Sequence, residues 1–560
     1  MLNLLFPRRR WGSPRVWHVI FWCLSLALFL PVPVRAQPKS SSKTGSPSKS
    51  SASGAQDSDP AKSGSATGEA KSDAGQAATA PDAAPPAAVA VDPSQTRKIV
   101  ANEIFRDPKV EKQKLLDINR FQHLVKQPVP RADILDLNAM AGGANTNIDK
   151  GLIDRVIDAM ASKLTDHANI QSLIDPPLTQ SPSAPAARAI HEATTVLLEP
   201  IFLARSAKNQ SFLAMYNRAL LQKMTPLLKN HLIPRIQAMI VLGESGSLDM
   251  LGTYESQIRD PNQTIWVKLW ALEGIVNISE AGGRLIPAAE IEAAKIVADF
   301  LEKEDDIPWP AQLRALEALS ALRQGFVPNR SRYADMANAA MHLLADADSK
   351  LEVRAEAAKA LGLMQINAGV PKYNYDLIAQ TAGLLAADLG AEIGTLWPNS
   401  PVRAAAPNPS GKATAAKKNT AKTSVPSTPA KPAVATNPAK AKYLTALLVG
   451  PVYQAFDGVT GLRESGLLHA GAGFSPAYTE KVFALVKAVA KASVDLIYSG
   501  SRQYDVRKKD LTAQVGALRD FLGKNAPADR HLVPDGVAYP LPEAQAAQLP
   551  APQAQAAKPR

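Results

Sequence analysis

Apolar residues recur at helical spacing between about residues 95 and 524, and few segments alternate apolar and polar residues with period two. The segment 264–279 illustrates the pattern, because Leu269 and Leu272 fall on one side of a helix. Asn262 stands just before this segment, where its side chain is expected to cap the amides of the first turn. The pattern predicts an all-α fold.

Four of the predicted helices align with one another and recur every 33, 44 and 42 residues. They start at Ile233, Trp266, Pro310 and Glu352. Each has a long polar residue, a small residue three positions later and an apolar residue seven positions later. A further helical segment precedes each one, at about 208–229, 247–259, 288–303 and 333–346. Regular recurrence of helix pairs predicts a repeat architecture.

The last of these helices resembles the second helix of HEAT and armadillo-like repeats. Val353, Arg354 and Ala357 match the family's valine-arginine-x-x-alanine start, and residues 360–362 match its alanine-leucine-glycine finish. The resemblance covers roughly residues 205–366 and implies a HEAT-like α-solenoid, in which helix pairs stack into a superhelical array. It implies an architecture and not an activity. The alternative is an irregular α-helical bundle.

Three segments have almost no large apolar side chains, so they are predicted to be disordered. They are the Ser/Ala/Pro/Lys-rich linker 37–95, the basic Pro/Ala/Lys/Thr-rich insertion 399–442 and the Pro/Ala/Gln-rich tail 525–560. The rest divides into a helical repeat domain at 96–398 and C-terminal helices at 443–524. We expect the C-terminal helices to pack on the end of the array.

The first 36 residues have the order of a secretory signal peptide. Three arginines at 8–10 precede an apolar run at 16–30, and Val34 and Ala36 are the small residues of a cleavage site. Cleavage after Ala36 is expected, with the mature chain in the periplasm or outside the cell. The alternative is a membrane anchor formed by residues 16–34, which nearly reach the length of a spanning helix.

The net charge of +12 is concentrated outside the predicted helical body. The signal contributes five arginines, and the stretch from Arg403 to Lys442 contributes eight basic residues and no acidic one. A nucleic-acid-binding domain concentrates basic charge on its folded face, so nucleic acid is not an expected partner. The basic linker suits an anionic wall polymer or membrane surface. The alternative is a solubilising spacer.

Candidate catalytic chemistry is sparse. Cys23, the only cysteine, lies in the signal, so the mature chain has no disulfide, cysteine-ligated zinc or thiol nucleophile. His191-Glu192 lacks the second histidine of a zinc-protease motif, because Thr195 stands there. The acidic run 302–306 lacks the spacing of a calcium loop. No catalytic, cofactor-binding or metal-binding residue is predicted.

Three tryptophans are the candidate partner-binding residues. Trp266 and Trp270 are neighbours on one helix, and Trp309 starts the second helix of the next repeat. Exposed tryptophans would anchor a partner, whereas buried ones would belong to the core. We expect an exported, non-enzymatic helical-repeat scaffold that binds another protein in the envelope or outside the cell. The alternatives are a cell-wall or polyanion binder acting through 399–442, and an unrecognised hydrolase.

Overall fold

The chain divides into two units, Met1–Ile104 and Phe105–Arg560. The computed structural model describes parts of the second unit only, namely residues 106–144, 147–174, 185–280, 285–328, 334–366, 370, 372–397, 437–459, 465–469, 476–499, 503–534 and 536–539. The predicted signal 1–36, the linker 37–95, most of the insertion and the end of the tail lie outside these residues. The described part is all-helical, as predicted, and contains no strand beyond two isolated bridges.

The described helices fall into three groups along the chain. The N-terminal group contains α3 (Pro108–Lys112), α4 (Arg131–Ala141), α5 (Lys150–Thr165), α6 (His167–Ile174) and α7 (Pro185–Ala207). The middle group contains α8 (Gln210–Met224), α9 (Leu232–Ser245), α10 (Leu251–Arg259), α11 (Ile265–Glu280), α12 (Pro287–Lys303), α13 (Trp309–Leu322), α14 (Asp335–Ala345) and α15 (Leu351–Leu363). The C-terminal group contains α16 (Tyr375–Thr395), α17 (Pro438–Leu447), α18 (Tyr453–Asp457), α19 (Pro476–Ile497) and α20 (Tyr504–Lys524).

Short helices of other types complete the described secondary structure. The 3-10 helices are η2 (Ile118–Arg120), η3 (Thr225–Lys229), η4 (Leu248–Met250) and η7 (Leu467–His469), and η6 (Leu448–Val452) is a π-helix between α17 and α18.

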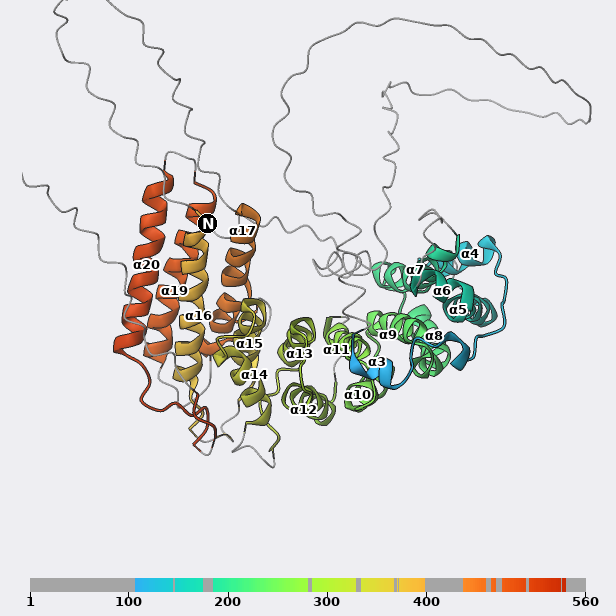
Figure 1. Ribbon diagram of the computed structural model, residues 1–560, viewed down its shortest axis with the longest axis horizontal. Coiled ribbons are helices and arrows are strands. Elements are labelled where there is room, and N and C mark those ends of the chain that lie inside the picture. The colour runs from blue at the N-terminus through green and yellow to red at the C-terminus, as the bar shows by residue number, and fades with distance from the viewer. Residues whose placement is uncertain are drawn as a thin grey trace, which may run out of the picture. The chain divides into compact units, whose positions relative to one another are not determined.

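The middle helices form two rows (Figure 1). The second helices of the predicted pairs, α9, α11, α13 and α15, are successive neighbours in one row, and α10, α12 and α14 are successive neighbours in the other. Each first helix also packs against the second helix that follows it. The eight helices predicted in this region therefore all occur, and they pack in chain order.

Glycine allows the closest contacts between these helices. A Cβ on Gly243 of α9 would lie 2.7 Å from the carbonyl oxygen of Trp270, and one on Gly274 of α11 would lie 2.5 Å from the ring of Tyr254. Tyr254 of α10 is fully buried there and donates a hydrogen bond to the carbonyl of Leu242, at 2.6 Å. Small residues thus allow α9 and α11 to approach and admit a ring from the other row.

The C-terminal helices pack on α15 and on one another. α16 contacts α15 and forms a bundle with α19 and α20, while α17 packs on α16 and α19. α18 contacts α15, where a Cβ on Gly362 would lie 2.1 Å from the carbonyl oxygen of Ala455. This agrees with the predicted contact between the C-terminal helices and the end of the row.

Two predicted disordered segments begin or end at the wrong residue. α17 starts at Pro438, inside the predicted insertion, because Asn437 caps it by accepting a hydrogen bond from the Lys440 amide. Residues 526–534 and 536–539, inside the predicted tail, bury Leu532, Val533 and Tyr539. Burial of these few apolar side chains orders a segment whose average composition is that of a linker. Among the described helices, none is long and apolar enough to cross a membrane.

Candidate functional site

A segment that contains α3 and η2 crosses the turns that join the two rows of helices. This segment, residues 107–127, is called the strap below. The main chain of the strap forms hydrogen bonds with several helical elements. The Leu115 carbonyl accepts from the Leu232 amide at 3.1 Å, and the Gln122 carbonyl accepts from the Asn230 side chain at 3.0 Å. The Leu124 amide donates to the Thr165 hydroxyl at 3.0 Å. Val110 and Leu115 are its buried apolar anchors.

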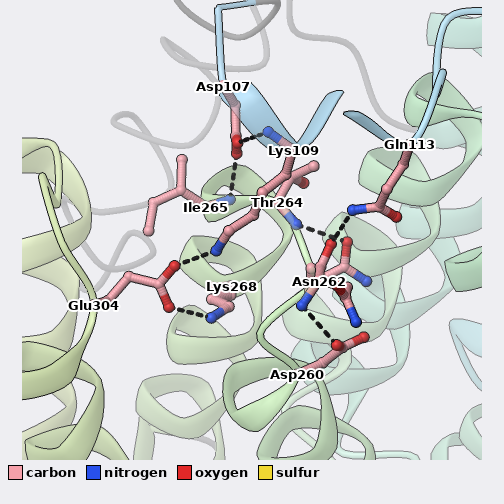
Figure 2. Close-up of polar contacts among 10 residues, drawn as sticks. Asp107, Lys109, Gln113, Asp260, Asn262, Thr264, Ile265, Lys268 and Glu304 are labelled. Carbon is pink, nitrogen blue, oxygen red and sulfur yellow. Dashed lines mark hydrogen bonds and ion pairs between the residues drawn. The ribbon is translucent and has the colours of Figure 1, made fainter. Parts of the chain in front are cut away.

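Asp107 of the strap caps a helix that lies far away in the sequence (Figure 2). One carboxylate oxygen accepts from the Lys109 amide at 2.9 Å, and the other accepts from the Ile265 amide at 2.9 Å, at the start of α11. The prediction that the Asn262 side chain caps this helix is wrong, because the Asp107 carboxylate accepts the hydrogen bond from the Ile265 amide at the helix start. The Asn262 amide instead donates to Asp260, and its carbonyl accepts from the Gln113 side chain.

A buried lysine lies beside this cap. Lys268 of α11 is almost fully buried, and its ammonium pairs with Glu304, which also receives the ammonium of Lys109 (Figure 2). Burial lowers the pKa of Lys268, although the hydrogen bond to Glu304 opposes this change. Burial alone would raise the pKa of Glu304, but the bonds from the two lysines outweigh burial and hold it below its ordinary value. One carboxylate therefore links the strap, α11 and the turn before α13.

Lys268 belongs to a repeating set of contacts. The long polar residues that align the predicted repeats include Arg235, Lys268 and Arg354, and each reaches the next element of the array. Arg235 donates to Gln263 at 3.2 Å, Lys268 pairs with Glu304, and Arg354 lies 3.7 Å from Asp388. Three of the four aligned residues thus make a polar link to the element that follows their helix; Gln312 is the fourth.

A second set of charges lies between the helices of one row. Glu273 of α11 pairs with Arg314 of α13 at 2.6 Å, and Arg314 also pairs with Glu317. Burial alone would lower the pKa of Arg314, but these carboxylates raise it. Glu244 of α9 is buried nearby, and one of its oxygens has no hydrogen-bond partner among the described residues. Burial, and then the charge of Glu273, raises the pKa of Glu244 to about 7.

The three candidate tryptophans have different surroundings. Trp266 and Trp270 are only 6% and 8% exposed, so these two side chains belong to the packed interior of α11. Trp309 is 41% exposed at the start of α13, five residues after Glu304. The structure therefore does not bring the three together as one exposed ridge, and only Trp309 offers a large accessible surface.

The residues with candidate chemistry remain dispersed. His191 and Glu192 are exposed on α7, and the acidic run 302–306 includes Glu304, whose role here is to bind two lysines. His123 of the strap and His167 of α6 stack edge to face, with ring centres 4.8 Å apart, a contact that sequence spacing could not indicate. Within the described ranges, no group of three or more His, Cys, Asp or Glu side chains could hold a metal ion.

Comparisons with protein-family models, with curated proteins and with solved structures give no match to this chain.

Proposed function

We propose that this chain is an exported, non-enzymatic scaffold whose HEAT-like α-solenoid binds another protein in the cell envelope or outside the cell. The strap is the observation that supports this proposal best. It is a segment with short helical turns, held across successive turns of the two rows by hydrogen bonds, buried apolar side chains and ion pairs. We propose that a partner segment contacts the exposed part of the same turns, next to the strap, where Trp309 is accessible.

The two rows of helices favour the repeat architecture. In a solenoid each repeat packs mainly on its neighbours, so a long surface remains for partners. The successive contacts in each row, and the polar links from Arg235, Lys268 and Arg354, fit that pattern. An irregular bundle would not be expected to place polar links to the following element at three of the four aligned positions, Arg235, Lys268 and Arg354.

Trp309 is the proposed anchor for the partner. It is exposed at the end of the turn that carries Glu304, so it adjoins the place where the strap begins. A partly exposed tryptophan on a rigid helix provides a large contact area with few rotatable bonds, which is typical of energetically dominant interface residues.

Export is tested by sequencing the N-terminus of the mature protein. We expect Gln37 as the first residue of a protein recovered outside the cytoplasm. An intact N-terminus in the membrane fraction would instead favour the anchor formed by residues 16–34.

Partner binding is tested by photo-crosslinking in cells. A photoreactive residue at Asp305, exposed in the same turn, should give a discrete protein adduct that disappears in Trp309→Ala. A matched probe at Ile286, which is 70% exposed at the start of α12, should not give that adduct. Deletion of 399–436 should leave the adduct unchanged. No adduct from Asp305, or loss of it on that deletion, contradicts the scaffold proposal.

A further inference from the structure

We propose that His231 makes part of the strap a pH-sensitive latch, which is closed at neutral pH and opens when the imidazole of His231 takes up a proton. The latch is residues 115–124 of the strap, which lie against the start of α9. These contacts are within the chain, so the latch does not depend on the proposed protein partner.

His231 caps α9 with a ring nitrogen that has no proton. Its Nδ1 atom accepts a hydrogen bond from the Ile233 amide at 3.2 Å, in the first turn of the helix. A neutral imidazole has one nitrogen that can accept a hydrogen bond, whereas an imidazolium has two donors and no acceptor. A proton on Nδ1 therefore removes the cap. It also places a positive charge at the amino end of the helix, where the helix dipole disfavours cations.

The latch covers this ring. His231 is 1% exposed, and the Phe121 ring packs edge to face against it, with ring centres 6.0 Å apart. The next residue, Leu232, donates its amide to the Leu115 carbonyl. The guanidinium of Arg120 lies over the Phe121 ring, so the cover carries a positive charge of its own. Hydration of a charged His231 ring therefore requires the latch to move.

The groups around His231 act on its protonation in both directions. Burial has the largest effect and lowers the pKa of His231 to about 4. The Leu116 carbonyl and the Asp117 carboxylate, both in the latch, oppose this change. His167 of α6 and Arg235 of α9 reinforce it. The closed latch thus holds the ring in its neutral form.

A second pair of histidines lies at the same end of the strap. The rings of His123 and His167 have their centres 4.8 Å apart, so protons on both would place two like charges side by side. The Asp166 carboxylate is already paired with Lys126, at 2.9 Å. The Phe121 carbonyl lies 3.4 Å from Nε2 of His167, which is long for a hydrogen bond. This pair should therefore add to the opening of the latch at low pH.

The direction of the pH dependence follows from the two states of His231. With the latch open, the ring is hydrated and has the ordinary pKa of 6.5, whereas in the closed latch the pKa is about 4. The open form binds more protons between these values, so the closed form loses stability as pH falls through this range. The open fraction should rise by up to about 25-fold from pH 7.5 to pH 5.

The test is hydrogen exchange of the Leu232 amide in the chain from Gln37, at pH 7.5 and pH 5. Protection factors remove the intrinsic pH dependence of exchange. We expect the protection of Leu232 to fall at pH 5 by a factor close to the rise in the open fraction. The Ile265 amide, which is bonded to Asp107 at the other end of the strap, should keep its protection.

Two variants separate titration of His231 from its packing. Asparagine can accept the cap bond but does not titrate, so His231→Asn should give the same Leu232 protection at both pH values. Phe121→Ala uncovers the ring and keeps the cap, so it should lower protection already at pH 7.5 and shrink the further change at pH 5. The matched control His191→Asn, at an exposed histidine of α7, should retain the full pH dependence.

Three results would overturn the proposal. One is a Leu232 protection factor that is equal at the two pH values in the parent chain. Another is an equal loss of protection at Ile265, because the whole strap would then open. The third is a pH dependence that persists in His231→Asn and disappears in His123→Asn/His167→Asn, which would assign the switch to the second histidine pair.

Discussion

Lys268 and Glu244 illustrate two outcomes for a charge buried between helices. Lys268 is compensated by a carboxylate, so its burial is accompanied by an ion pair. Glu244 has an oxygen without a hydrogen-bond partner in the described part of the chain, and the nearby charge of Glu273 disfavours its ionisation. A buried charge without full compensation destabilises a fold, so Glu244 should make stability depend on pH.

Glu244→Gln tests this dependence. The unfolded chain releases the proton near the ordinary value of 4.5, whereas the folded chain releases it at about 7. The folded state binds more protons between these values, so the stability contributed by this group falls as pH rises through that window. Glutamine cannot ionise, so the variant should match the parent near pH 4.5 and exceed it at pH 8, by at most about 3 kcal/mol.

Urea unfolding at the two pH values measures this difference. The charged groups that act on the carboxyl of Glu244 are Glu273, Arg205, Arg314 and Glu280. The substitution leaves all four in place. A difference between variant and parent that is the same at both pH values would show that Glu244 does not titrate in this window.

The strap is the element that the sequence could predict least. Helical periodicity is a local signal, so it predicted the helices of 205–366. The cap of α11 comes from Asp107, which is 158 residues away from the amide that it accepts from. Local spacing favoured Asn262 because a distant carboxylate has no signature near the helix start.

The burial of Trp266 and Trp270 has a similar cause. Their spacing placed them on one helix, but exposure depends on which neighbours pack against it. α9 and α13 lie on either side of α11 in the row, so both tryptophans are covered. Trp309 lies at the start of its helix and is more exposed. The helical spacing of the three tryptophans could not show which of them are buried and which is exposed.

Asp107→Ala tests the role of the strap as a distant cap. Loss of an N-terminal cap costs about 1 kcal/mol, so opening of the strap should become roughly fivefold more frequent. Hydrogen exchange at the Ile265 amide should accelerate accordingly. Glu111→Ala, at an exposed strap residue, is the matched control. Equal exchange in the two variants would mean that the Asp107 contact does not hold the strap.

At the scale of the whole molecule, the strap adds long-range links to helices that otherwise pack on near neighbours. The helices of the two rows pack mainly on their neighbours, and cooperativity along such rows is limited. The strap contacts the turns before α9, α11 and α13 at once, which should make these pairs unfold together.

Leu115→Ala tests this coupling. Removing a buried leucine side chain should destabilise the protein by about 3 kcal/mol and, by loosening the strap, broaden the urea transition. Leu344→Ala on α14 removes an equally buried side chain that does not belong to the strap. It should lower the midpoint by a similar amount without changing the slope. The coupling would be refuted by equal slopes in both variants.

The sequence separation of Lys109 and Glu304, which form an ion pair, implies a delay between the synthesis of the strap and that of its last binding site. The two residues are 195 positions apart, and a ribosome adds about 5–20 residues per second. The strap is therefore made roughly 10–40 seconds before the last of its binding sites exists. Until the helices that cover them are made, Val110 and Leu115 are apolar side chains exposed to premature contacts in the nascent chain. A chaperone that holds an extended peptide would be most useful to this protein at its strap.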